Sequence, residues 1–325
     1  MAATCLTGLD PTSYQPHALH DSRRNWPETN CYVDLWIELL NSLGHNPTAA
    51  LGFTVAQDFE GDQFTFFKFP AEDLAASYGV SVQELAIYDT VEAHTIEQLQ
   101  RGRPVLVEVD SYFLPDTQGT AYRTTHGKTT IAINHLDSER CALHYFHNAG
   151  YFALSGADFN GIFRAEPNEA AVALFPYVEF VKLGASPASD SLPQVAITLL
   201  KKHLRLRPSG NPLRAYQQAF ATHAAKLTTR PMEFFHLYAF NTSRQFGANF
   251  ELLMSHLEWL RGQGESGLDT AIQGCEHIAS GAKTLQFQLA RAVAKHRFDA
   301  LENALSSMAE AYELTLDTLY ERYCK

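Results

Sequence analysis

Apolar residues recur with a helical period in the first long regular segment of the chain, residues 32–44 (YVDLWIELLNSLG). The apolar residues on one stripe are Val33, Trp36, Ile37, Leu40 and Leu43. This spacing indicates an amphipathic helix. Gly44 follows the last apolar position and suits a helix end. The pattern therefore predicts a helix that begins close to Cys31.

Shorter segments with strand or helix patterns fill the rest of the first half. The valine-rich run PVLVEVD predicts a strand, and two further strands predict a hairpin around the turn DSER. The expected strands are 63–69, 104–110, 129–137, 142–148 and 171–183, and the expected short helices are 71–79 and 94–102. One helix followed by an antiparallel set is typical of the α+β class.

Nearly all of the second half has helical periodicity, interrupted at PSGNP, TTRP and RGQGESG. The expected helices are 193–206, 212–227, 231–262, 266–296 and 298–323. Such a set predicts an antiparallel helical bundle. The Ala/Ser/Pro-rich stretch at 182–193 is typical of a linker. We therefore expect an α+β domain over residues 1–185 and an all-α bundle domain over residues 193–325.

The net charge of the chain indicates which classes of partner can be excluded. The net charge is −11, which argues against nucleic acid. Residues 1–185 carry 10 Lys and Arg against 23 Asp and Glu, whereas residues 186–325 carry 15 against 13; this difference also favours two domains. No apolar run is long enough to span a membrane, and the first residues do not have the pattern of a signal peptide. The expected location is the cytoplasm.

The five cysteines are dispersed and include no CxxC pair, which argues against a disulfide framework and a thiolate zinc site. Cys31 stands out because it lies at the start of the predicted helix. Free N–H groups and the helix dipole there favour a thiolate and can hold an oxyanion. Asn25, six residues upstream, could supply a second oxyanion donor. The alternative for Cys31 is a merely buried thiol.

A nucleophilic cysteine needs a base and a group that orients the base. Among 14 histidines, His126 is the best placed, because it opens the strand GKTTIAI. Asn148 is the expected orienting group, with His147 and Asp137 as alternatives.

A metal site is the competing interpretation of these histidines. His144 and His147 are three residues apart, and positions three apart on a strand point to opposite faces. We therefore expect neither a metal nor a resident cofactor.

Four further residues are candidates for substrate binding. Glu108 and Asp110 share a strand face, so they could bind the amino group of a substrate or equally pair with Arg123 or Lys128. Asn241 and Arg244 share a helix face; they could face a substrate or form interhelical hydrogen bonds.

The one basic cluster, at 201–214, holds Lys201, Lys202, Arg205, Arg207 and Arg214. It could dock an acidic partner. The alternative is a solvated helix face.

The order of a helix-borne Cys, a GRPVLVEVD strand, a strand-opening His and a polar residue closing the next strand resembles the papain-like cysteine fold. It is most similar to the branch that contains the double-glycine leader peptidases and the butirosin-type acyltransferases. Two departures from that pattern are Tyr32, where a Gly usually follows the nucleophile, and Asn25, where a Gln is usual. Both make peptidase activity a weaker expectation than thiol chemistry.

The whole chain further resembles the bacterial family named domain of unknown function 1839. The phrases that carry this likeness are NCYVDLW, DFEGDQFTFFK, LVEVDSYFLPDTQGTAYRTTHGKTTIAI, YFHNAGYF and FHLYAFNTSRQFGANFELL.

The acyltransferase resemblance implies an acyl- or aminoacyltransferase. Its donor would be a phosphopantetheine thioester on a small acidic carrier protein, and its acceptor an amine or hydroxyl. Two alternatives stay open: a cysteine hydrolase (peptidase, amidase or thioesterase) and a non-catalytic binding protein on the same fold.

Overall fold

The computed structural model describes residues 1–163, 176–295, 297–298 and 301–325. The first five residues of the strand expected at 171–183, and short stretches of the last two expected helices, lie outside the described residues. The chain divides into two compact units, each built from separate stretches of sequence. We call residues 1–20, 31–45 and 74–187 the sheet unit, and residues 21–30, 46–73 and 188–325 the helical unit.

Seven strands, counted in the described part of the chain, form one antiparallel sheet in the order β2-β7-β3-β4-β5-β6, with β1 paired to β4. The strands are β1 (Ala2–Thr4), β2 (Val80–Glu84), β3 (Val105–Asp110), β4 (Lys128–Asp137), β5 (Ala142–His147), β6 (Gly150–Ser155) and β7 (Val178–Leu183). The predicted hairpin is confirmed as β4 and β5, whereas β1, β2 and β6 were not foreseen.

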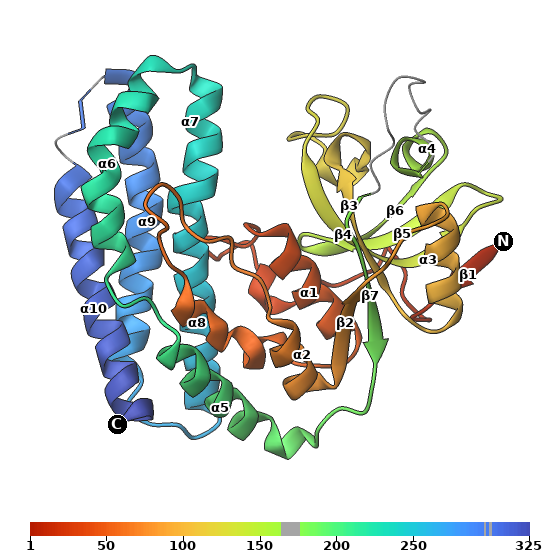
Figure 1. Ribbon diagram of the computed structural model, residues 1–325, viewed down its shortest axis with the longest axis horizontal. Coiled ribbons are helices and arrows are strands. Elements are labelled where there is room, and N and C mark those ends of the chain that lie inside the picture. The colour runs from red at the N-terminus through yellow and green to blue at the C-terminus, as the bar shows by residue number, and fades with distance from the viewer. Residues whose placement is uncertain (164–175, 296, 299–300) are drawn as a thin grey trace. The chain divides into compact units, whose positions relative to one another are not determined.

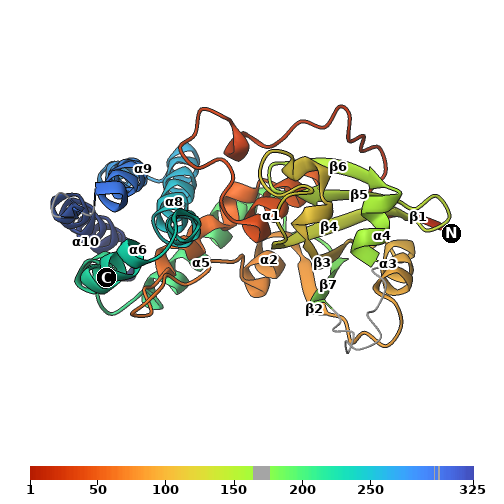
Figure 2. The ribbon, with the colours of Figure 1, turned by 90° about the horizontal axis from the view of Figure 1, so that it is seen from above.

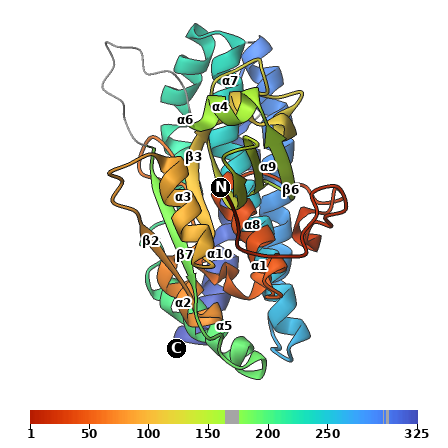
Figure 3. The same ribbon diagram turned by 90° about the vertical axis from the view of Figure 1, so that its right-hand side faces the viewer.

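Helices cover both faces of this sheet (Figures 1 and 2). On the face seen in Figure 3, α3 (Val91–Gln100) and α4 (Ala157–Phe163) cover alternate residues of the strands. Val105, Val107, Ile131, Ile133 and Phe159 belong to the buried cluster there. The predicted helix α1 (Cys31–Ser42) covers the other face and is buried almost throughout.

The helical unit consists mainly of long helices (Figure 1). They are α5 (Leu192–Arg205), α6 (Pro212–Thr229), α7 (Met232–Ala239), α8 (Gln245–Gly262), α9 (Asp269–Lys295) and α10 (Glu302–Cys324). The prediction of a mixed α+β region followed by an all-helical region is confirmed. The helix predicted over 231–262 is interrupted by a π-helical turn at Phe240–Arg244.

The strand predicted at 63–69 is wrong. This stretch belongs to the helical unit, where the only pairing in this region is an isolated bridge between Phe59 and Phe64. The ring of Phe64 packs on Tyr216 and Phe246 of the bundle at centroid distances of 5.3 and 5.1 Å. Phe64 is therefore an apolar anchor on the helices, whereas Phe66 is exposed.

Two shorter elements complete the described fold. A 3₁₀ segment at Pro47–Ala56 is capped by Asn46, whose side chain accepts the N–H of Thr48 at 3.0 Å. Helix α2 (Ala71–Tyr78) confirms the helix expected at 71–79. None of the helices in the described ranges is long and apolar enough to cross a membrane.

Candidate active site

Cys31 is the first residue of α1 and its side chain is half-buried. The N–H groups of a first helical turn have no intrahelical acceptors, so they can stabilise negative charge beside the sulfur. The other cysteines lie elsewhere. Burial raises the pKa of Cys5 to about 11 and also raises the pKa of Cys275. Cys141 lies in the β4–β5 turn, and Cys324 ends α10.

His126 forms a close pair with Asp110 just before β4. Its Nδ1 lies 2.5 Å from Oδ2 of Asp110. The other carboxylate oxygen accepts the N–H groups of Tyr112 and Gly127 at 3.0 and 3.1 Å. Because an ionised carboxylate only accepts hydrogen bonds, Nδ1 carries a proton and donates it to Asp110, so Nε2 is the nitrogen that can exchange a proton with a reactant. This is the tautomer that a general base requires.

The hydrogen bonds also keep Asp110 ionised. Burial raises the pKa of this carboxyl, but the hydrogen bonds from His126, Tyr112 and Gly127 outweigh burial and hold the pKa below its usual value. The ring of Tyr112 stacks on the imidazole, with centroids 4.4 Å apart and an interplanar angle of 11°. The imidazole, 71% exposed, is thus oriented by a carboxylate and a ring.

The loop that carries His126, residues 111–127, is tied down at two points. Arg123 and Tyr122 both donate to Asp158 of α4. At the second point, Asp116 accepts from Tyr145 and His147 of β5, each at 2.5 Å. The guanidinium of Arg123 also lies 5.4–5.5 Å from the centroids of three aromatic rings, those of Tyr112, Phe113 and Tyr122. The loop is therefore well anchored, and it fixes the position of His126 just before β4.

Cys31 and His126 lie on the same side of the sheet. The hydroxyl of Tyr32, next to Cys31, donates to Glu179 of β7 at 2.9 Å. Glu179 is paired with Leu106 of β3, so the two side chains share a face. Side chains alternate along a strand, so Asp110 points to that face too. The first turn of α1 therefore covers the face that carries the His126–Asp110 pair.

A cavity of about 570 Å³ opens beside this pair. Its ionisable lining residues are Glu108, Asp110, His126 and Lys128. Lys128 donates to Glu108 at 2.7 Å, so the pairing alternative foreseen for Glu108 holds. Asp110 pairs with His126 rather than with Arg123 or Lys128. Cys31 is not among the described residues that line this cavity.

The three residues proposed from sequence to orient His126 make other contacts or lie in other turns. Asn148 is the first residue of the two-residue turn between β5 and β6, with a left-handed φ of 45° that Asn adopts readily. His147 is buried and bonds to Asp116 and Thr129. Asp137 accepts the N–H groups of Glu139 and Arg140 in the β4–β5 turn. Asp110, considered from sequence as a substrate ligand or as a partner of Arg123 or Lys128, is the carboxylate at His126.

Three candidates belong to the helical unit. Arg244 ends the π-helical turn and donates to the carbonyl of Glu28. Asn241 is exposed and donates to the carbonyl of Leu237 at 2.8 Å. The backbone of Asn25 is hydrogen-bonded on both sides, to Glu251 and to Lys283. Arg244, expected from sequence to face a substrate or to form interhelical hydrogen bonds, instead binds the segment that precedes Cys31 in the sequence.

Sequence reasoning missed a buried charged cluster on α1. His20 contacts Glu38 through Nδ1 and lies 3.3 Å from Asp34 through Nε2, and Tyr14 donates to Glu38 at 2.6 Å. Burial lowers the pKa of His20, but Asp34 and Glu38 outweigh it and raise the pKa to about 9. His20 is therefore a cation at neutral pH. Positions 34 and 38 lie off the apolar stripe predicted for this helix, so only the fold could show this cluster.

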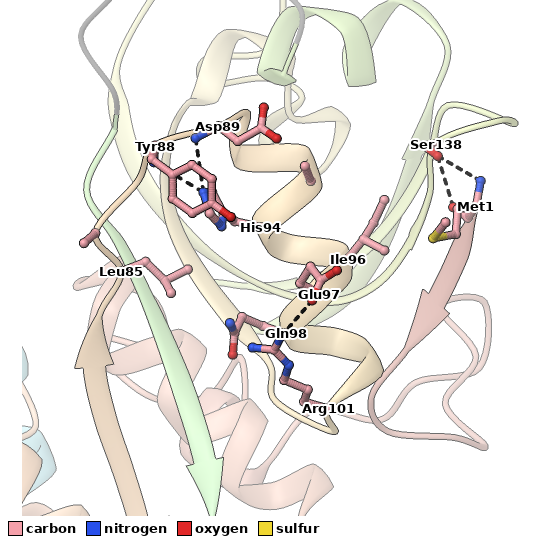
Figure 4. A pocket seen from close by; sticks show the side chains of 12 residues that line it. Met1, Leu85, Tyr88, Asp89, His94, Ile96, Glu97, Gln98, Arg101 and Ser138 are labelled. Atoms are coloured by element: carbon pink, nitrogen blue, oxygen red, sulfur yellow. Dashed lines mark hydrogen bonds and ion pairs between the residues drawn. The ribbon is translucent and has the colours of Figure 1, made fainter.

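A second cavity, of about 660 Å³, lies beside α3 (Figure 4). Its polar groups are largely satisfied by one another. Arg101 donates to Glu97 at 2.8 Å, and His94 accepts the N–H groups of Tyr88 and Asp89 at 3.3 Å each. No group of three His, Cys, Asp or Glu residues suited to a metal ion is found within the described ranges.

Comparison with protein families adds an identification. Residues 15–183 match the DUF1839 N-terminal domain, and residues 189–321 match the DUF1839 C-terminal domain. The chain belongs to the DUF1839 family. The two matches meet between residues 183 and 189, and together they take in Cys31, the His126–Asp110 pair and Arg244. No curated protein matches the sequence. The chemistry of this DUF1839 protein is therefore argued from its site.

Proposed function

We propose that this protein is a cysteine-dependent acyl- or aminoacyltransferase whose sheet unit is a papain-like catalytic domain. The observation that carries the proposal is the pairing of two features on one sheet face. Cys31 starts the helix that covers this face, and His126, oriented by Asp110, stands at the edge of β4 on it. A nucleophile at a helix start and an oriented imidazole are the two parts that thiol catalysis needs.

In the first half-reaction Cys31 gives its thiol proton to Nε2 of His126, and its sulfur attacks the carbonyl carbon of a thioester. The carbon–sulfur bond of the donor breaks, and the donor leaves as a thiol that takes its proton from His126. The N–H groups at the start of α1 stabilise the oxyanion. We keep the side chain of Asn25 as the proposed second hydrogen-bond donor to this oxyanion.

In the second half-reaction an amine or hydroxyl attacks the acyl-Cys31 carbonyl and loses its proton to Nε2 of His126. The thiolate of Cys31 leaves, which restores the enzyme. Glu108, which pairs with Lys128, and Asp110, which pairs with His126, line the 570 Å³ cavity. We place the acceptor in this cavity, where Asp110 acts through His126.

The donor we propose is a phosphopantetheine thioester on a small acidic carrier protein. A thiol is a good leaving group, so the chemistry does not need the strong leaving-group protonation that peptide cleavage requires. This fits a site in which Tyr32 and Asn25 replace the residues usual in the peptidases. The proposed docking surface is the exposed part of the basic cluster near Arg205.

The test is intact-mass analysis of the full-length protein exposed to a panel of aminoacyl thioesters. A mass increase equal to the acyl group, absent in Cys31→Ser, supports the proposal. An acceptor amine is then added. Transfer of the acyl group to the amine supports a transferase, whereas release as the free acid in the presence of amine supports the hydrolase alternative. Wild-type protein that acquires no acyl group from any donor excludes both for these substrates and leaves the binding-protein alternative.

A further inference from the structure

Glu251 of α8 holds the backbone of the segment that leads into Cys31. This carboxylate is 3% exposed and accepts two consecutive N–H groups. Oε1 accepts from Asn25 at 2.8 Å and Oε2 from Trp26 at 2.9 Å. Burying a carboxylate is costly unless its oxygens are hydrogen-bonded. The charge of Glu251 is therefore matched to one conformation of residues 25 and 26.

Trp26 locks the same segment onto α9 and α8. Its indole N–H donates to the carbonyl of Ala279 at 3.0 Å, and the side chain is buried. A Cβ on Gly247 would lie 2.7 Å from the indole. Because real Cβ atoms do not approach a ring so closely, glycine at 247 makes room for this tryptophan. Lys283 adds a hydrogen bond to the carbonyl of Asn25 at 2.9 Å.

The π-helical turn holds the last residues before Cys31. Arg244, at its end, donates to the carbonyl of Glu28, and Gln245 donates to the carbonyl of Thr29 at 3.1 Å. The side chain of Asn30 donates to the carbonyl of Phe67 at 2.7 Å. A π turn inserts one residue into a helix and is found most often at functional sites. Here it brings two consecutive side chains, 244 and 245, to two consecutive carbonyls.

We infer that Glu251 and Arg244 are positioning residues for the segment that leads into the nucleophile. The inference rests on the proposed function. Five of the six residues from 25 to 30 are hydrogen-bonded to other residues of the helical unit, and Asn30 is bonded covalently to Cys31. Holding these residues restrains the backbone that enters Cys31. A displacement of a nucleophile by about 1 Å can cost about 10²-fold in rate.

This arrangement also assigns a role to the phrases RRNWPETN and FNTSRQFGANFELL, which are 210 or more residues apart in the sequence. The polar residues of the second phrase interrupt an apolar helix. Arg244, Gln245 and Glu251 each bind main-chain atoms of the first phrase. Recognition of main-chain atoms controls conformation rather than side-chain identity, as a positioning role requires.

The experiment compares full-length Glu251→Gln with Glu258→Gln, an exposed carboxylate seven residues along the same helix. Iodoacetamide alkylation of Cys31 is followed by mass spectrometry across pH, and hydrogen exchange is followed at residues 24–30. We expect Glu251→Gln to lose protection at Asn25 and Trp26, to shift the pH profile of Cys31 alkylation and to slow acyl transfer about 10- to 100-fold. Glu258→Gln should behave as wild type.

Two further variants keep the inference testable if Glu251→Gln does not fold. Arg244→Met should weaken the hold on Glu28, and Arg244→Lys should restore part of the alkylation profile, because Lys can still donate to one carbonyl. Loss of protection at residues 24–30 with an unchanged alkylation profile and unchanged transfer would overturn the inference, and the segment would be structural only. If wild-type Cys31 takes no acyl group from any donor, the proposed function is wrong. Alkylation of Cys31 in the variants would still show whether Glu251 and Arg244 affect the reactivity of its thiol.

Discussion

Nδ1 of His126 lies 2.5 Å from Oδ2 of Asp110, and the two residues enter the sheet from adjacent antiparallel strands. Asp110 is the last residue of β3 and pairs with Lys128, the first residue of β4. The contact therefore depends on strand register, and a shift of one residue would turn Asp110 to the opposite face. The anchored loop 111–127 between the strands holds that register.

Replacing His126 should affect the rate far more than the fold. His126→Ala should lower acyl transfer by about 10²–10⁴-fold, the usual contribution of a general base. Asp110→Asn should lower it by a smaller factor, because an amide no longer fixes the Nδ1–H tautomer. Steady-state kinetics across pH measures both. Since His126 is largely exposed, the melting temperature of His126→Ala should stay close to wild type.

The matched control for the orienting role is Asn148→Gly. Glycine tolerates the positive φ of 45° at this turn, so the hairpin should persist. If Asp110 orients His126, this variant keeps wild-type kinetics. A larger rate loss in Asn148→Gly than in Asp110→Asn would return the orienting role to Asn148.

Cys31 should be the cysteine that reacts first and the only one needed for turnover. Iodoacetamide at neutral pH, followed by peptide mapping, should modify it ahead of the other four, because burial raises the pKa of both Cys5 and Cys275. Cys31→Ser should abolish acyl labelling without unfolding the protein. Faster labelling of Cys141, or wild-type turnover in Cys31→Ser, would contradict the assignment.

Local patterns predicted the elements of the site better than its partners. The helix that starts at Cys31 and the β4–β5 hairpin follow from periods of 3.6 and 2, which any local window reveals. The Asp110–His126 and Asp116–His147 pairs depend instead on strand register and on the path of the loop. Residue types alone do not predict either of these. The alternating phenylalanines at 63–69 fit a strand and a bundle anchor equally. The π turn at Phe240–Arg244 inserts a single residue that no residue type in this run marks, so it could not be predicted from the sequence.

The buried His20 cluster should make the free energy of unfolding depend on pH. The pKa of His20 is raised from 6.5 to about 9 by Asp34 and Glu38, despite burial. A raised folded-state pKa stabilises the protein fully below the unfolded pKa, and this stability is lost as pH rises through the folded value. Unfolding free energy should therefore fall between about pH 6.5 and 9, by at most about 3 kcal/mol. Denaturant melts across this range measure it.

The control for this prediction is His20→Gln, which removes the titrating cation. Its unfolding free energy should be lower than that of the wild type at pH 6.5, and its slope above that pH should be shallower. An unchanged slope in His20→Gln would assign the pH dependence to another group.

The link between Asp116 and His147 should be important for stability rather than chemistry. Their side chains are 3% and 2% exposed. Removing one partner of a buried pair typically costs about 3–5 kcal/mol, and Asp116→Ala also strands the hydroxyl of Tyr145. Denaturant unfolding should show this loss, and the loop 111–127 should become sensitive to protease. Arg140→Ala, at an exposed turn, should cost almost nothing; equal losses in both variants would contradict the anchoring role.

The carrier-docking surface that we propose is best tested at Arg205. Lys202 bonds to Asp73 at 3.1 Å, and Arg214 bonds to Glu313 at 2.6 Å. The guanidinium of Arg207 stacks 3.8 Å above the ring of Tyr320. Arg205 is exposed and lines a cavity of about 490 Å³. Charge reversal at Arg207 would disturb packing, whereas Arg205→Glu changes only the field that an approaching acidic carrier meets.

Arg205→Glu should slow acylation of Cys31 from a carrier-bound thioester, and the effect should shrink as salt rises, because exposed charges are screened beyond about 10 Å at 0.1 M salt. Acylation from a small thioester should be unchanged, since such a donor has no acidic surface to steer. Stopped-flow or quenched-flow acylation rates at several salt concentrations measure both donors. Lys226→Glu, on α6 and also exposed, controls for net charge alone. If Arg205→Glu slows both donors equally, or if Lys226→Glu reproduces its effect, this surface does not dock the carrier, and any donor protein must be recognised elsewhere on the chain.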